Sequence, residues 1–150
     1  MLNRAYKTAI AYFLLFTLLL FLSGILIFID KIGFSYDDVI HYYLGNSKEF
    51  IVAKTFTGLL KIILPHIFAF GLFIIVIIHF IIFTKQRNNK DIRLIIYIIL
   101  LTALFEISSP FVIVAGLKIF AYVKIFTFLI FYLLILYIFF ILFKSIIYDK

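Results

Sequence analysis

The chain has 150 residues, of which 67% are hydrophobic and 14% are charged, with a formal net charge of +7 and no cysteine. Soluble domains carry about a quarter charged residues, so a mean hydropathy of +1.27 excludes an ordinary soluble domain. The lack of cysteine excludes disulfides, thiolate zinc sites, iron–sulfur clusters and c-type haem attachment. The basic residues flank apolar runs, so membrane topology explains the charge and no nucleic-acid partner is expected.

Four apolar runs predict four membrane-spanning helices. At a rise of about 1.5 Å per residue, each is long enough to cross a hydrocarbon layer of about 30 Å. They cover residues 8–29, 62–84, 94–115 and 122–143. The first run is too long for a signal-peptide core and lacks a convincing cleavage site, so we interpret it as a retained helix. The sequence predicts an all-α, polytopic four-helix bundle that forms a single transmembrane domain over residues 1–150 and contacts the lipid bilayer.

The positions of Lys and Arg predict the orientation. The short segment 85–93 is dense in cations, with Lys85, Arg87, Lys90 and Arg93. The positive-inside rule places this segment in the cytoplasm. Both termini are then cytoplasmic, and residues 30–61 form an outer loop. Lys118 and Lys124 are interpreted as boundary cations of the outer turn before the fourth span, which can begin as early as Phe120.

The outer loop contains the signature of a short amphipathic helix. Ser35 and Asp38 have the S-x-x-D spacing of a capping box, and Gly45 is a plausible C-terminal stop. At helical spacing one face then collects the apolar side chains Tyr36, Val39, Ile40, Tyr43 and Leu44. Such a helix is predicted to lie on the outer membrane surface.

The opposite face of this helix offers a weak metal site. Asp37 and His41 are one helical turn apart and can share a metal ion with Asp38 or Glu49. The alternative is an ordinary solvated polar face.

Two histidines distinguish the second span. His66 lies near one end, directly after Pro65, and His79 lies near the other end. Polar groups at membrane depth are functional candidates, and transmembrane b-haem proteins place axial histidines at two depths of one helix. A separation of thirteen residues, however, rotates the second histidine by about 140° around the helix. The other predicted spans contain no histidine. Haem b ligated by His66 and His79 therefore requires a homo-oligomer or another subunit, and the alternative is that each imidazole bonds across helices.

Glu106 is the strongest single candidate for a functional residue. It lies about midway between Arg93 and Lys118, near the predicted bilayer centre, where a carboxylate is costly unless it is protonated, paired or hydrated. Pro110 lacks the donor that would bond the backbone carbonyl of Glu106, so this carbonyl is predicted to be free, with Ser108 and Ser109 available as partners.

These polar groups suggest a proton path. By helical rise Glu106 falls in depth between His66 and His79, so the acid, the two imidazoles and Ser108 and Ser109 can form a path with intervening waters. The alternative is a protonated Glu106 that bonds to a neighbouring helix.

The segments FSYDDVIHYYLGN and KTFTGLLKIILPHIFAFGLF carry a resemblance over residues 34–83. They resemble small four-helix bacterial inner-membrane proteins of unassigned activity, some with a c-type cytochrome domain in the first extracytoplasmic segment. The resemblance implies the bacterial cytoplasmic membrane, redox association and an outer first loop. His66 matches the second histidine of that group's H-x-H pattern, while Leu64 stands at the first, and no c-haem motif occurs.

Three functions follow as alternatives. The first is a membrane subunit or assembly factor of a respiratory or redox complex, with other membrane subunits or a second copy as partners. The second is a b-haem or metal-binding electron-transfer protein that uses His66 and His79. The third is a small transporter or proton-conducting protein that uses Glu106. No hydrolase, phosphate-loop or dinucleotide motif occurs, so the sequence does not indicate an enzyme.

Overall fold

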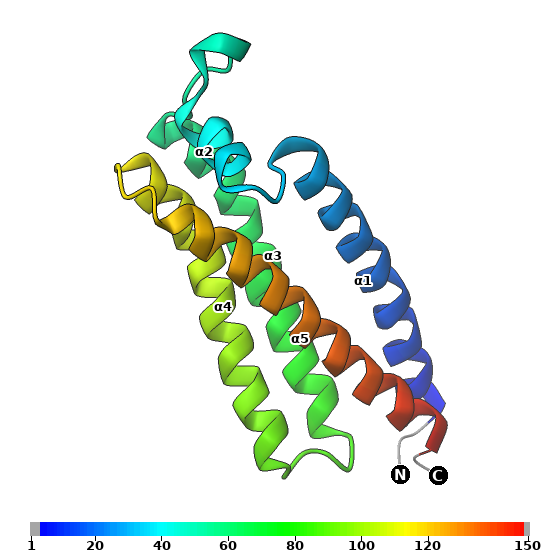
Figure 1. Cartoon of the computed structure of the whole chain (residues 1–150). Coiled ribbons are helices and arrows are strands. Elements are labelled where there is room, and N and C mark those ends of the chain that lie inside the picture. Colours follow the sequence, from blue (N-terminus) through cyan, green and yellow to red (C-terminus); the bar gives the residue numbers. More distant parts are fainter. Residues whose placement is uncertain (1–3, 149–150) are drawn as a thin grey trace.

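The computed structural model describes residues 4–148 and consists of helices joined by short connections (Figure 1). In chain order the elements are α1 (Arg4–Lys31), α2 (Tyr36–Leu44), the 3-10 helix η1 (Ser47–Glu49), α3 (Phe56–Ile82), α4 (Lys90–Val114) and α5 (Phe120–Tyr148). Within this described part of the chain there is no β-strand. Helices α1, α3, α4 and α5 are each long and apolar enough to cross a membrane. The predicted all-α class, with four spans and a short helix between the first two, is therefore confirmed.

Two of the spanning helices begin before their predicted apolar runs, at capping side chains. Thr55 Oγ1 accepts a hydrogen bond from the Gly58 amide at 3.1 Å, and α3 begins at the next residue, Phe56. Asn89 Oδ1 accepts from the Asp91 amide at 2.9 Å at the start of α4. Such caps satisfy amides that the first helical turn leaves without partners. Hydrophobicity indicates how much of a helix lies in lipid, whereas the cap determines where the helix begins.

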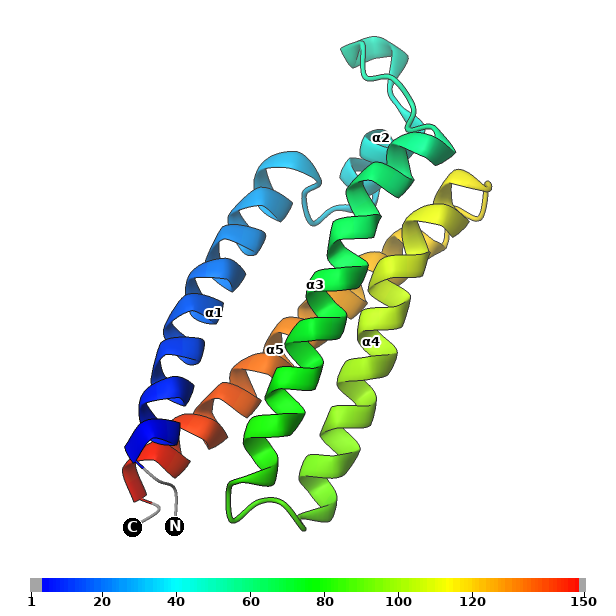
Figure 2. The ribbon, with the colours of Figure 1, turned by 180° about the vertical axis from the view of Figure 1, so that it is seen from behind.

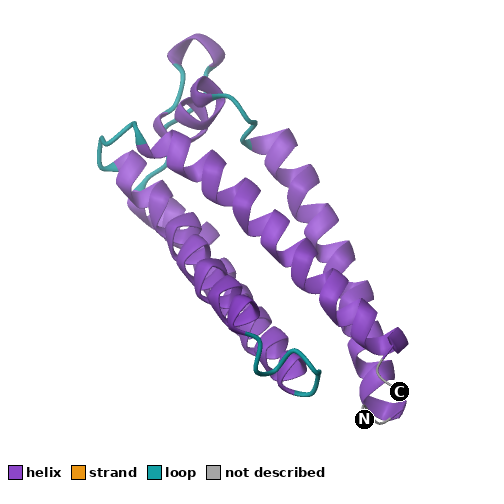
Figure 3. Ribbon diagram, turned by 60° about the horizontal axis from the view of Figure 1, so that its bottom comes forward, coloured by secondary structure: helices purple, strands orange, loops and turns teal. Residues whose placement is uncertain are grey.

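The four long helices form a bundle in which α5 crosses obliquely between α1 and the α3–α4 pair (Figures 1 and 2). The closest packing is between α4 and α5, while α3 lies along α4 and α1 packs on α5. The first turn of α1 and the last turn of α5 lie at the same end as the connection over residues 83–89 (Figure 3). We call this the loop end. Helix α2, η1 and the turn over residues 115–119 lie at the opposite end, which we call the α2 end (Figure 1).

The bundle interior contains two separate hydrophobic clusters. The larger runs from the loop end to the middle of the bundle and is built around Ile77, Ile99, Phe131, Ile135 and Ile138. The smaller lies at the α2 end and consists of Val39, Tyr43, Leu59, Ile63, Ile113 and Ala121. Helix α2 therefore contributes side chains to the interior of the bundle.

The short helix α2 is stabilised as predicted but packs differently. Ser35 Oγ accepts from the Asp38 amide at 3.0 Å, and Asp38 Oδ2 accepts from the Ser35 amide at 3.2 Å, which completes the predicted capping box. Gly45 is the C-terminal cap, as predicted. The apolar face turns inward, since Val39 and Tyr43 are buried against the ends of the spanning helices. Helix α2 thus covers the end of the bundle, while its position on the outer membrane surface stays a prediction.

Candidate functional site

An ion pair between α4 and α5 is the central polar feature of the bundle. Lys124 Nζ donates to the Glu106 carboxylate at Oε1 and also to the Glu106 backbone carbonyl, the latter at 3.1 Å. The two side chains are only 9% and 8% exposed, respectively. Thr127, one turn after Lys124, donates its hydroxyl to Glu106 Oε2 at 3.0 Å. The carboxylate therefore faces the bundle interior, with a partner for each of its oxygens.

The second bond of Lys124 follows from Pro110. Proline cannot donate to the carbonyl four residues earlier, so the Glu106 carbonyl is available to a side chain. The sequence proposed the two neighbouring serines as its partners, but Lys124 takes this place. Ser108 Oγ instead reaches the Phe105 carbonyl at 3.5 Å. Among the described residues, the buried Ser109 hydroxyl has no hydrogen-bond partner.

Sequence reasoning missed Lys124 because it was interpreted as a boundary cation of the outer turn. Helix α5 begins at Phe120, so Lys124 lies within the first turns of a spanning helix. By helical rise it lies about 6 Å inside the start of α5, while Glu106 lies about 12 Å before the end of α4. A lysine side chain can span such a difference in depth. A useful signal was the spacing of Lys124 and Thr127, which places two polar groups on one helix face.

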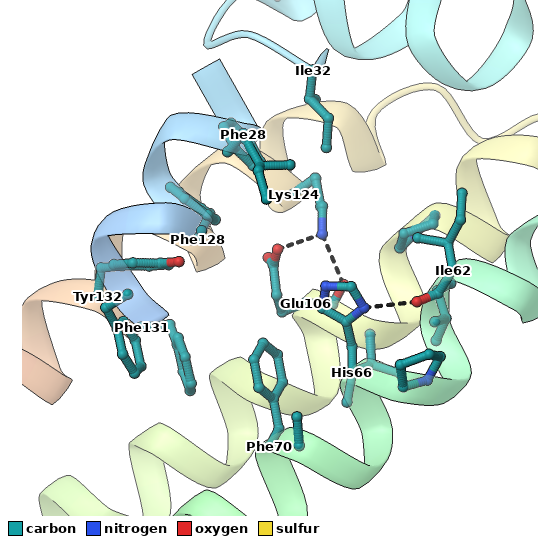
Figure 4. A pocket seen from close by; sticks show the side chains of 18 of the residues that line it. Phe28, Ile32, Ile62, His66, Phe70, Glu106, Lys124, Phe128, Phe131 and Tyr132 are labelled. Carbon is teal, nitrogen blue, oxygen red and sulfur yellow. Dashed lines mark hydrogen bonds and ion pairs between the residues drawn. The ribbon is translucent and has the colours of Figure 1, made fainter. Parts of the chain in front are cut away.

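Beside the ion pair lies a cavity of about 330 Å³ (Figure 4). Its walls come from the four spanning helices and from α2 and are rich in aromatic rings, and Glu106 and Lys124 form one corner. The rings on the spanning helices are those of Phe21, Phe28, Phe70, Phe73, Phe128, Phe131 and Tyr132. A side chain at Gly24 would overlap the Tyr132 hydroxyl, so this glycine lets Tyr132 approach the α1 backbone. The arrangement is an apolar chamber with a single charged corner.

His66 is the second polar group of this cavity. Its Nδ1 lies 2.7 Å from the Ile62 carbonyl oxygen. Because a carbonyl only accepts hydrogen bonds, Nδ1 carries the proton and Nε2 is left as an acceptor. His66 and Glu106 both line this cavity, and both are labelled in Figure 4. The proton path through them stays a prediction.

His79 occupies a different environment. It is exposed on α3, close to the loop end, and its ring centroid lies 5.0 Å from that of Phe83. His79 is not among the described residues that line the cavity. One copy of the chain thus supplies a single imidazole to the cavity.

The polar face of α2 is organised by hydrogen bonds. His41 Nδ1 lies 3.3 Å from Asn46 Nδ2 and 4.0 Å from Glu49 Oε2. Asp37 is exposed. In the part of the chain that the structure describes, no three carboxylates or imidazoles gather as metal ligands.

Tyr42 and Tyr43 of α2 form the wall of the cavity at the α2 end. Burial raises the pKa of the Tyr43 phenol far above its usual range, and the negative charge of Glu106 adds to the rise. Burial also raises the pKa of Tyr42, against a smaller opposing effect of Lys31. Both phenols therefore face the cavity in their neutral form, as additional hydrogen-bonding groups.

The spanning helices and the interior ion pair define a multi-pass helical membrane protein. The chain belongs to the Aq_1264_TM family, described as a transmembrane helical domain, which matches residues 33–150. The matched region includes Glu106, Lys124 and His66 and extends from the α1–α2 connection to the C-terminus. This agrees with the resemblance to small membrane proteins. No curated protein and no solved structure matches the chain.

Proposed function

We propose that this protein is an integral membrane accessory protein that binds a lipophilic molecule in the cavity between α1, α3 and α5. The observation that carries the proposal is the cavity itself, with a volume of about 330 Å³, aromatic walls and one polar corner. Ligand pockets have volumes of about 300–1,000 Å³ and combine mainly apolar walls with a few convergent polar groups. Buried ionisable residues at such a place are typical of functional sites.

The cavity is accessible from the lipid. Several of its lining residues on α1 and α3 are exposed on the outer surface of the bundle, among them Leu20 at 61%, Ile27 at 62% and Ile62 at 39%. The walls of α1 and α3 therefore end at a surface that faces the hydrocarbon layer. A molecule dissolved in the bilayer can enter sideways, without crossing water.

The proposed setting is the bacterial cytoplasmic membrane, with the α2 end outside and the loop end in the cytoplasm. The cations of residues 85–93 support this orientation, because they gather at the loop end. The resemblance to redox-associated inner-membrane proteins supports an accessory role beside a respiratory or redox complex, with other membrane subunits or a second copy as partners. Co-purification of a membrane complex with the tagged chain tests this part of the proposal, and isolation of the chain alone contradicts it.

Haem and proton conduction receive less support from the geometry. Two axial imidazoles in one cavity require a second copy of the chain or another subunit, because His79 is not among the described residues that line it. Proton transfer through Glu106 requires its carboxyl to exchange hydrogen-bond partners, whereas Lys124 and Thr127 already bond both of its oxygens. The ion pair of Glu106 and Lys124 is better suited to forming a fixed polar wall in a binding site.

The test fills the cavity with a larger side chain. Ala69 lines the cavity on the exposed face of α3, so Ala69→Phe occupies space that a ligand would use. The matched control is Ala9→Phe, at an exposed position of α1 outside the described lining. Native mass spectrometry of protein extracted in mild detergent should show a bound lipophilic molecule in the wild type and Ala9→Phe, and much less of it in Ala69→Phe. Equal occupancy in all three proteins contradicts the proposed function.

A further inference from the structure

Resting on this proposed function, we infer that the ligand is an uncharged, ring-headed lipid of the quinone and quinol class. Its oxygens would lie at the corner formed by Glu106, Lys124 and His66, and its apolar tail would leave between α1 and α3. The inference depends on three properties of the cavity: its charge, its hydrogen-bonding groups and the shape of its walls.

The polar corner carries no net charge. Lys124 is the single Lys or Arg among the described cavity-lining residues, and the Glu106 carboxylate already neutralises it. The neutral imidazole of His66, with Nδ1 donating to the Ile62 carbonyl, adds no charge to this corner. A phosphate head would lie next to a carboxylate without a spare cation, and an ammonium head would lie next to Lys124. In a medium of low dielectric both repulsions are costly, so an uncharged head fits this corner.

The corner nevertheless offers both donors and acceptors. An ammonium group has three N–H donors, and the carboxylate and backbone carbonyl of Glu106 take two of those on Lys124. The third is available to a carbonyl oxygen. His66 Nε2 is an acceptor and is suited to a hydroxyl group. A quinone presents carbonyl oxygens and a quinol presents hydroxyls, so the two forms would use different partners here.

The walls favour a flat head. The rings of Phe28 and Phe128 stack with centroids 3.9 Å apart, and Tyr132 packs on Phe128 at 4.4 Å. Where α3 meets α5, the ring centroids of Phe70 and Phe131 lie 4.9 Å apart. Aromatic rings in the cavity walls suit a planar ligand, because such a ligand can stack on them or pack against their edges. A volume of about 330 Å³ is at the small end for ligand pockets, so a long tail must extend into the lipid.

The experiment compares the two histidines of α3. Protein in detergent micelles is titrated with a decyl-tailed benzoquinone, with its quinol under reducing conditions, and with a short-chain phosphatidylglycerol, and binding is measured as the shift of the thermal unfolding midpoint. We expect both ring-headed lipids to bind the wild type. His66→Leu should weaken the quinol about tenfold and leave the quinone nearly unchanged, because only a hydroxyl donates to Nε2. His79→Leu, outside the described cavity lining, should change neither.

The other outcomes separate the two proposals. Binding of phosphatidylglycerol, abolished by Ala69→Phe, without binding of the ring-headed lipids overturns the inferred head and leaves the proposed function intact. Quinol binding that is insensitive to His66→Leu, or equally sensitive to His79→Leu, also overturns the placement of the head. If none of the three probes binds and Ala69→Phe loses no native ligand, both proposals fail.

Discussion

The loop end and the α2 end of this bundle are stabilised in different ways. Towards the loop end, isoleucine and phenylalanine side chains fill the interior, accompanied only by hydroxyl groups such as Thr102 and Ser145. At the α2 end, by contrast, the smaller cluster lies beside a buried ion pair and a cavity. Both buried formal charges of the described residues belong to this ion pair. The comparison indicates that the larger cluster serves as a scaffold up to the middle of the bundle, where its Phe21, Phe73 and Phe131 also line the cavity.

The two histidines of α3 follow the same division. His66 lies towards the α2 end, bonded to a carbonyl and facing the cavity. His79 lies towards the loop end, on the exposed surface beside an aromatic ring. Both imidazoles are exposed, but of the two His66 alone is among the described residues that line the cavity, and this provides an internal control for experiments on either one.

The largest effect on stability is expected from removing the buried cation, Lys124, towards the α2 end. Lys124→Met leaves Glu106 buried without its partner, and we expect a loss of about 3–5 kcal/mol in the free energy of unfolding. Thermal unfolding in micelles, followed by circular dichroism, measures the loss. The exposed Lys144 provides the control Lys144→Met, which should cost less than about 0.5 kcal/mol. The double variant Glu106→Gln/Lys124→Met should regain most of the stability, and a double variant as unstable as the single one argues against the pair.

A cavity-forming substitution tests the larger cluster. Ile135 is fully buried in the larger cluster, so Ile135→Ala removes packing without touching any polar group. We expect a loss of about 2 kcal/mol, the low end for such substitutions, because transfer from water adds little within a bilayer. Denaturant titration of the reconstituted protein measures the loss. Binding to the cavity should persist at temperatures where the variant is folded, and loss of binding there would show that the larger cluster and the cavity are coupled.

Thr127→Val measures how much the hydrogen bond from Thr127 to Glu106 contributes to stability. The substitution keeps the shape of the side chain and removes the donor to Glu106 Oε2. One buried hydrogen bond to a charged group is lost, so we expect a cost of about 1.5 kcal/mol, the low end for such bonds. Chemical unfolding of Thr127→Val in parallel with Thr8→Val, where the hydroxyl is exposed on α1, isolates the effect. Equal costs at both positions would mean that the hydrogen bond from Thr127 to Glu106 contributes nothing to stability.

The smallest effect concerns pH and the α2 end. Because burial and the charge of Glu106 raise the pKa of Tyr43, the folded state favours the neutral phenol. The associated stability is fully present below the ordinary tyrosine pKa of about 10 and is lost as the pH rises above it. Unfolding midpoints between about pH 9 and 11 should therefore fall more steeply for the wild type than for Tyr43→Phe. Parallel curves would contradict the burial of this hydroxyl.

The sequence contained the fold almost completely, because apolar length and capping patterns act locally along the chain. The four spans and the capping box of α2 follow from such signals. The site could be predicted only in part. Glu106 and the free carbonyl created by Pro110 were visible, but their partner Lys124 depends on how α4 and α5 align across the turn. Which faces meet, and hence where a cavity remains, is a property of packing that hydropathy does not encode.

The ion pair has a consequence for the biogenesis of the protein. If α5 entered the bilayer alone, Lys124 would meet hydrocarbon at a cost of about 2.5–3.5 kcal/mol, and Glu106 on α4 would meet the same difficulty. The turn over residues 115–119 joins the two helices so closely that each charge is delivered with its counterion. Helices α4 and α5 are therefore expected to leave the translocation machinery as one hairpin, already neutralised, before α1 and α3 assemble around it.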